Sequence, residues 1–112
     1  MVSSVPAGKF EFLCVVPDKP GALEKRLAAR PTHFANLQSQ VTTGVIKVGG
    51  ATLEEVPTPD GPLKMNGSAV VLVASSVEEA REFLAQDIYA TSGVWDVEKA
   101  QILPFKCAVR EP

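Results

Sequence analysis

Histidine is scarce in this sequence, because it occurs only once among 112 residues, as His33. With one histidine and two cysteines, Cys14 and Cys107, that form no CxxC pair, the chain lacks the ligands of a zinc site, and we expect no metal. It also has no apolar run near the roughly 20 residues of a membrane span, and its start does not resemble a signal peptide. We therefore expect a cytoplasmic protein without a membrane partner, with both cysteines as free thiols.

The chain also has no excess of positive charge. Lysine and arginine number 11 against 13 aspartate and glutamate residues, and the net charge is −2. Since nucleic-acid binders usually carry a basic face, we expect no nucleic-acid partner. Aromatic residues are few, with five Phe, one Tyr and one Trp. A core of this size gains from association, so the composition favours a homo-oligomer.

The first part of the chain predicts a leader, a strand and a turn. Residues 1–8 are rich in Ser, Pro and Gly and indicate a flexible leader, and residues 9–112 fit a single domain. Apolar residues alternate over 9–16, which predicts a strand. Prolines and a glycine end this strand over 17–21.

Helical spacing begins at Ala22, and Pro31 interrupts it. Two arrangements are open: a kinked helix over 22–43, or a short helix followed by a second helix that starts near Pro31. In the second arrangement His33 lies in a first turn, where the helix dipole favours a neutral imidazole. The inward stripe of this segment is predicted to consist of Phe34, Leu37 and Val41.

The second half begins at Gly44, a plausible helix C-cap. A strand is predicted over 45–48. The Gly49-Gly50 pair that follows suggests a bulge or a close approach of the backbone to another group. Whether the strand continues over 51–56 is left open. The prolines and the glycine of residues 57–62 predict a loop there.

An apolar segment without alternation, 68–74, predicts a strand covered on both faces at the centre of a sheet. Ser76 and Glu79 form a capping box, and the helix after it is predicted to reach Ala85. A polar segment over 86–93 precedes a final strand predicted over 96–105.

The order strand-helix-strand-strand-helix-strand predicts a ferredoxin-like α+β fold, with one antiparallel sheet and both helices on one face. The other face would remain bare, and a second copy of the chain is its simplest cover. The first and last strands are neighbours in this fold, so Cys14 and Cys107 could come near each other, which is no evidence for a disulfide.

Several segments resemble the YCII (YciI-like) family: residues 22–37, Ser76–Ala80, Asp87–Tyr89, Ser92–Trp95 and Leu103–Lys106. The resemblance extends from Lys9 to Val109. It implies a dimeric α/β barrel of two ferredoxin-like subunits, each with a pocket that holds a histidine and an aspartate, matched here by His33 and Asp87. It also implies chemistry on small organic acids or cyclic carbonyl compounds without a metal or organic cofactor.

Two departures from the family pattern affect the predicted pocket. Ile88 follows the aspartate where the family usually has proline, and Val48-Gly-Gly50 replaces the usual Ala-Gly-Pro after the second strand. We therefore expect Gly50 to contribute to substrate binding in a wall reshaped for a different ligand.

A histidine held by an aspartate can act as a general base, because the carboxylate fixes the tautomer and raises the basicity of the other ring nitrogen. We expect His33 to be this base, and Asp87 to be its orienting group or the acid. The alternative is structural: His33 is then a partly buried helix residue, and Asp87 only caps a turn.

Other candidate residues have two possible roles each. Arg30 could bind a substrate carboxylate or phenolate, or form a surface ion pair with Glu24 or Glu54. Tyr89 could orient a substrate oxygen or form an aromatic wall. The single tryptophan, Trp95, fits the core or a dimer interface better than a ligand contact.

The sequence thus favours a cofactor-independent enzyme of secondary metabolism that transfers protons on a small cyclic or aromatic oxygenated substrate. Dehydration or another elimination is the expected reaction, with isomerisation or cyclisation as the alternative. The competing hypotheses are a non-catalytic dimeric module that binds a metabolite, and a purely structural dimerisation domain.

Overall fold

The computed structural model describes residues 5–111, so residues 1–4 of the expected leader lie outside the described range. The strands are β1 (Phe10–Pro17), β2 (Ile46–Leu53), β3 (Met65–Ala74) and β4 (Gln101–Phe105). The helices are α1 (Leu23–Thr42), α2 (Val77–Ala85), the short α3 (Ile88–Thr91) and the 3-10 turn η1 (Val97–Lys99).

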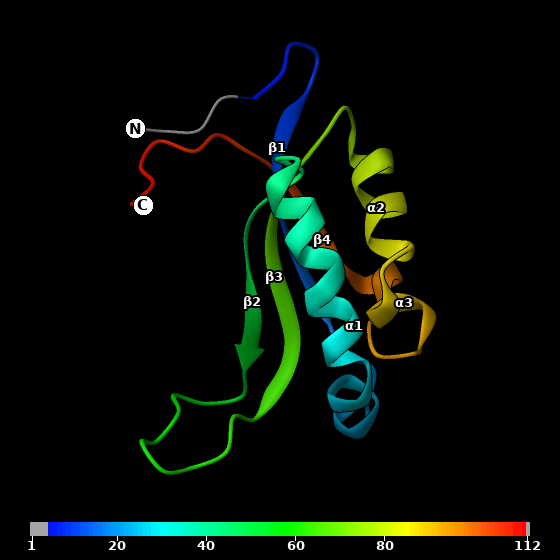
Figure 1. The fold of residues 1–112 in the computed structure, drawn as a ribbon, viewed down its shortest axis with the longest axis vertical. Coiled ribbons are helices and arrows are strands. Elements are labelled where there is room, and N and C mark those ends of the chain that lie inside the picture. Colours follow the sequence, from blue (N-terminus) through cyan, green and yellow to red (C-terminus); the bar gives the residue numbers. More distant parts are fainter. Residues whose placement is uncertain (1–4, 112) are drawn as a thin grey trace.

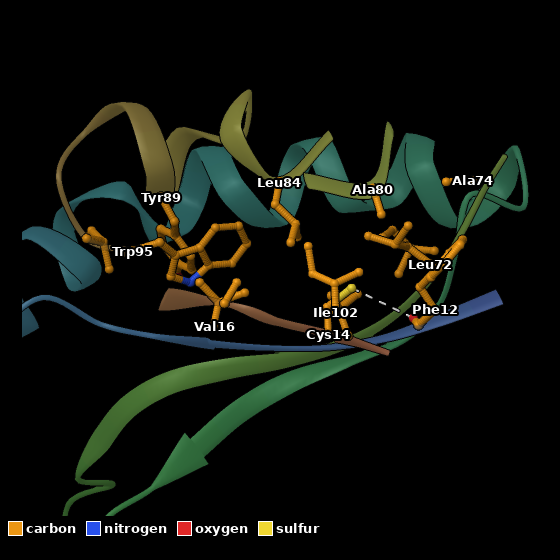
Figure 2. Close-up of a cluster of buried hydrophobic side chains, with 14 of the residues drawn as sticks. Phe12, Cys14, Val16, Leu72, Ala74, Ala80, Leu84, Tyr89, Trp95 and Ile102 are labelled. Carbon is orange, nitrogen blue, oxygen red and sulfur yellow. Dashed lines mark hydrogen bonds between the residues drawn. The ribbon is translucent and has the colours of Figure 1, made fainter. Parts of the chain in front are cut away.

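The four strands form one antiparallel sheet in the order β2-β3-β1-β4 (Figure 1). β3 therefore lies between β1 and β2, and β1 lies between β3 and β4, so each strand-helix-strand unit skips one strand. Helices α1 and α2 both cover the same face of the sheet, as Figure 2 shows from the side. This arrangement confirms the predicted ferredoxin-like α+β fold, and it confirms 68–74 as part of a central strand.

The hydrophobic core fills the space between the sheet and the helices (Figure 2). Alternate residues of β1 point into it, because successive side chains of a strand face opposite sides. Phe12, Cys14 and Val16 are buried, and Cys14 pairs with Val70 of β3 and Ile102 of β4. Further members of this core are Leu72, Ala74, Ala80, Leu84, Tyr89, Val94 and Trp95.

Helix α1 runs without interruption from Leu23 to Thr42 and contains Pro31. The arrangement with a second helix starting near Pro31 is therefore wrong. His33 lies in the middle of the helix, and the expectation that a first-turn dipole favours its neutral form no longer applies. The helix ends as predicted, because Gly44 adopts φ +83° and its N–H donates to the carbonyl oxygen of Val41.

The predicted inward stripe of α1 is correct only for Leu37, which packs against the core. Phe34 and Val41 are 47% and 56% exposed, whereas the buried residues of the helix are Arg26, Ala29 and His33. These three positions are spaced by three and four residues, so they share one face. Hydrophobicity alone misassigned that face, because polar partners on the sheet and on α3 bury the arginine and the histidine.

The sequence leaves the extent of β2 open, and β4 is shorter than predicted. β2 continues through Gly49-Gly50 to Leu53, with an irregular register after Ile46. β4 begins only at Gln101, because residues 97–99 form a 3-10 turn instead of a strand. Arg81 of α2 holds this turn, since its Nη1 donates to the carbonyl oxygen of Val97 at 2.7 Å.

The predicted approach of the two cysteines does not occur through strand pairing. Cys14 faces Ile102 across the sheet, whereas Cys107 follows the end of β4 and donates its backbone N–H to Glu11. Both thiols are free. Burial raises the pKa of the Cys14 thiol to about 11, so this side chain packs as a neutral apolar group.

The face of the sheet opposite the helices also carries apolar side chains. Leu13 pairs with Val71 and Leu103, and half of the Leu103 side chain is exposed.

Among the described residues, no helix is both long and apolar enough to cross a membrane.

Candidate active site

The single histidine meets an aspartate 54 positions later in the chain. His33 lies on α1, and Asp87 is the N-cap residue of α3. The His33 Nδ1 donates to the Asp87 Oδ2 at 2.8 Å, and both residues are buried, with 8% and 9% exposed. The structure therefore brings together the two residues that the sequence analysis named as a pair.

Asp87 is itself held by the backbone. The same Oδ2 accepts the N–H of Tyr89 at 2.8 Å, which is the side-chain cap of α3. Since Nδ1 donates its proton to this carboxylate, the Nε2 of His33 is left unprotonated in the neutral ring and can accept a proton. The proline that the family usually places after the aspartate is not required for this cap, because Ile88 begins α3 here.

Three aromatic rings lie around the imidazole of His33, and Phe34 is the most distant of them, with ring centroids 6.1 Å apart and an interplanar angle of 42°. Tyr89 stacks on the imidazole, with ring centroids 3.9 Å apart and an interplanar angle of 13°. Trp95 meets it edge-on at 5.9 Å and 81°. Tyr89 therefore packs on the imidazole and also lines the cavity described below. Burial raises the pKa of its phenol against the opposing effect of Arg26 and Arg30, so the hydroxyl remains protonated.

These residues line a cavity of about 330 Å³ between α1 and the β2–β3 part of the sheet. Arg30 and Gly50 line it as well, so all five predicted site residues share one cavity. Most of the wall is apolar and includes Phe34, Leu37, Ile46, Leu53, Leu63, Met65, Phe83 and Leu84.

Arg30 is exposed, and its guanidinium carbon lies 4.8 Å above the centre of the Phe34 ring. Within residues 5–111 it forms no ion pair with Glu24 or Glu54, so the surface ion pair considered for it is not formed. The position next to the cavity leaves this cation able to meet an anionic group of a ligand.

Sequence reasoning missed the most buried charged residue of the cavity wall, Arg26. Its Nη1 donates to both carboxylate oxygens of Asp18, at 2.9 and 3.2 Å. Its Nη2 donates to the carbonyl oxygen of Gly67 at 3.0 Å and to the Ser68 Oγ at 2.8 Å. The available signal was its position seven residues before His33, which puts both on one helix face.

The partners of Arg26 extend the network to the tryptophan. Trp95 Nε1 donates to the Ser68 Oγ at 3.1 Å, so one hydroxyl accepts from both side chains. Burial raises the pKa of the Asp18 carboxyl, and Arg26 opposes this shift. Within the described part of the chain, no group of three or more His, Cys, Asp or Glu side chains could hold a metal ion.

The family assignment rests on most of the chain. The model of the YCII-related domain matches residues 10–106. The chain belongs to the YCII-related family. This confirms the resemblance carried by the segments around His33 and Asp87.

Two of the relatives of this YCII-related chain are fungal proteins. Fusaric acid biosynthesis protein 2 of Gibberella fujikuroi is 33% identical over 96 residues, which span 86% of this chain and 92% of that protein. Aspartate kinase FUB3 of Fusarium oxysporum f. sp. lycopersici is 35% identical over 98 residues, which span 88% of this chain but only 18% of that protein. The chain thus corresponds to a small part of the kinase.

One solved structure combines a similar fold with a ligand. It is 5-chloro-2-hydroxyhydroquinone dehydrochlorinase (TftG) from Burkholderia phenoliruptrix AC1100, in complex with 2,5-dihydroxybenzoquinone. The match has a TM-score of 0.70 and 28% identity, and it covers 86% of this YCII-related chain and 93% of that chain.

Proposed function

We propose that this YCII-related protein is a cofactor-independent enzyme that catalyses a proton-transfer elimination on a small oxygenated ring compound. His33 is the general base, and Asp87 orients it. The observation that carries the proposal is the buried 2.8 Å hydrogen bond from His33 Nδ1 to Asp87 Oδ2 at the wall of a cavity. The biosynthetic relatives and the dehydrochlorinase neighbour support an enzyme that converts small molecules.

The size of the cavity supports a single substituted ring as the substrate. An engineered protein cavity of about 150 Å³ binds benzene, so about 330 Å³ accommodates one ring with several substituents. The apolar wall suits the ring, and Arg30 suits a carboxylate or phenolate at its edge. Gly50 leaves the backbone of β2 uncovered, since a Cβ there would meet nothing within 4 Å.

In the proposed reaction, the Nε2 of His33 takes a proton from a carbon next to a carbonyl or from a ring hydroxyl. The electron pair of the broken bond forms a new double bond, and the leaving group departs with its own bonding pair. A leaving hydroxyl takes the proton back from the imidazolium and leaves as water. The Asp87 carboxylate stabilises the intermediate imidazolium, and positioned acid–base catalysis of this kind contributes about 10²–10⁴-fold in rate.

The test compares the wild type with His33→Ala and Asp87→Asn on chlorinated hydroquinones and on cyclic keto–enol compounds, followed by absorbance of the ring. We expect turnover to fall by about 10²–10⁴-fold in both variants. Asp60→Asn is the matched control, because it makes the same chemical change in an exposed loop. Undiminished turnover in both site variants contradicts the catalytic pair. Binding of 2,5-dihydroxybenzoquinone that is weakened by His33→Ala, without turnover of any candidate, favours the metabolite-binding module instead.

The proposed assembly is a homodimer in which a second copy covers the open face of the sheet. The half-exposed Leu103 opposite Leu13 supports it, because exposed apolar strands gain stability from a partner. Light scattering at micromolar concentration should give about twice the 11.9 kDa mass of one chain, and a clean monomer would contradict the barrel. The two free thiols support the expected cytoplasmic location.

A further inference from the structure

The ring of Tyr89 lies against two side chains of the same helix. His33 stacks on it at 3.9 Å, and the guanidinium carbon of Arg26 lies over it, 4.8 Å from the ring centre. Arg26 and His33 are seven residues apart on α1, which corresponds to two turns and about 10.5 Å along the axis. One aromatic ring fills this spacing, so Tyr89 is held between a cation and the imidazole.

Arg26 is fixed by the protein through its terminal nitrogens, whereas its buried Nε has no hydrogen-bond partner among the described residues. The residue is 3% exposed, and its two terminal nitrogens donate to Asp18, to the carbonyl oxygen of Gly67 and to Ser68. Arg30, one turn further along α1, is exposed and carries no such contacts. The two arginines that line the cavity therefore differ, because Arg26 is buried and held by the protein whereas Arg30 is exposed.

The network of Arg26 reaches two of the three aromatic rings around the imidazole, which are Tyr89 and Trp95. It touches Tyr89 directly, and it shares the Ser68 hydroxyl with the indole N–H of Trp95. Trp95 in turn meets the ring of Tyr89 edge-on, with centroids 5.6 Å apart. Two routes of contacts therefore connect Arg26 with the imidazole of His33, one through Tyr89 and one through Ser68 and Trp95.

The imidazole needs more than its hydrogen bond to Asp87. One hydrogen bond at Nδ1 restrains the ring but still allows it to tilt about the line from its Cβ to the Asp87 oxygen, and this tilt moves Nε2. A stacked neighbour fixes the plane of the ring. Since a misplacement of about 1 Å can cost about 10²-fold in rate, the stack has a role that the carboxylate cannot fill.

We propose that Arg26 is a positioning residue, which fixes the ring plane of His33 through Tyr89 and through the Ser68–Trp95 contact. The catalytic part of this inference rests on the proposed role of His33 as the base, whereas the structural part does not. Arg26 makes no contact with the imidazole itself among the described interactions, so it acts through other residues.

The single histidine of the chain makes the test specific, because the ring ¹⁵N and ¹H signals of His33 appear alone in a two-dimensional NMR spectrum. Signals of one Nδ1-protonated tautomer are expected for the neutral ring of the wild type and of Tyr89→Phe, which keeps the stack. Arg26→Lys and Tyr89→Leu should give broadened signals or a mixture of tautomers. Arg81→Lys is the matched control, because this arginine contacts η1 instead of the site.

Unchanged His33 signals in folded Arg26→Lys and Tyr89→Leu overturn the proposal. If Arg26→Lys fails to fold by circular dichroism, the double variant Asp18→Asn/Ser68→Ala decides the matter, because it removes the carboxylate that holds Arg26 in place over Tyr89 and the hydroxyl that Arg26 shares with Trp95. A disturbed His33 signal in this variant supports the proposal, and an unchanged one overturns it.

Kinetics then separate this inference from the proposed function. On any substrate that the wild type converts, Arg26→Lys should lower kcat by about 10–100-fold with little change in KM, since substrate contacts remain. A fall in kcat/KM caused by KM alone contradicts positioning. If Arg26→Lys disturbs the His33 signals while His33→Ala retains full turnover, the proposed function fails and the positioning network stands.

Discussion

Replacing Gly49 with alanine should raise the stability of the fold and weaken ligand binding at the same time. Gly49 lies in β2, pairs with Val70 and lines the cavity. Its φ is not positive, and an added Cβ would lie 3.9 Å from Val70 Cγ2 and 4.0 Å from Ile46 Cγ2, which are ordinary contacts. Nothing in the backbone therefore requires glycine here, and its missing side chain serves to leave space.

The two expected effects have different magnitudes. Glycine inside a strand costs about 0.5–1 kcal/mol relative to alanine, so Gly49→Ala should raise the free energy of unfolding by that amount and Tm by about 2–6 °C. A ring that fills the cavity has to move away from the new methyl group. Overpacking of this kind costs about 1–3 kcal/mol, which corresponds to a Kd about 5–150 times weaker.

Thermal denaturation followed by circular dichroism measures the first effect. Titration with 2,5-dihydroxybenzoquinone measures the second, because the single tryptophan, Trp95, lines the cavity and reports on a bound quinone by its fluorescence. Gly67→Ala is the matched control, since its Cβ would lie only 2.6 Å from the carbonyl oxygen of Val16 and must destabilise the fold. A loss of stability in Gly49→Ala like that of the control, or unchanged quinone binding, refutes the reasoning.

Three further predictions concern the thiols and a helix cap. At pH 8 a thiol reagent should modify Cys107 in the native protein and Cys14 only after unfolding, as mass spectrometry of the labelled chain would reveal. Between pH 9 and 11 the unfolded Cys14 thiol loses its proton while the folded one keeps it, so this group should lower the free energy of unfolding by about 1.4 kcal/mol per pH unit. Cys14→Ala should abolish that component of the slope in urea titrations at several pH values, and an unchanged slope would contradict it. Ser76→Ala should cost about 1 kcal/mol in urea unfolding, because it removes the 3.0 Å hydrogen bond from the Glu79 N–H, and an unaltered midpoint would argue against the cap.

Features that depend on neighbours in the chain could be predicted from the sequence. The alternation that buries Phe12, Cys14 and Val16, the cap formed by Ser76 and the positive φ of Gly44 each follow from a few adjacent residues. Their order then restricted the fold to a ferredoxin-like sheet, which the observed strand order confirms.

The site could be predicted only in part, because its contacts join distant segments. The meeting of His33 with Asp87 was implied by a family resemblance and not by spacing. Arg26 was missed because a charged residue on a helix is usually solvent-exposed, and its burial is made favourable by Asp18, Gly67 and Ser68, which lie in other segments of the chain. Phe34 was misassigned to the buried face of α1 because it lines an open cavity that no local pattern reveals.

The buried side chains of helix α1 are the guanidinium of Arg26, the methyl group of Ala29 and the imidazole of His33. In most helix bundles, leucines occupy such buried positions. The attachment of α1 and the proposed chemistry therefore depend on the same side chains. Substitutions that adapt the site to a new substrate should therefore lower the thermal stability of the protein, because each altered contact also weakens the packing of α1. An engineer who wants tolerance to such changes would reinforce α2 and the outer strands first, where a gain in robustness leaves the reacting groups untouched.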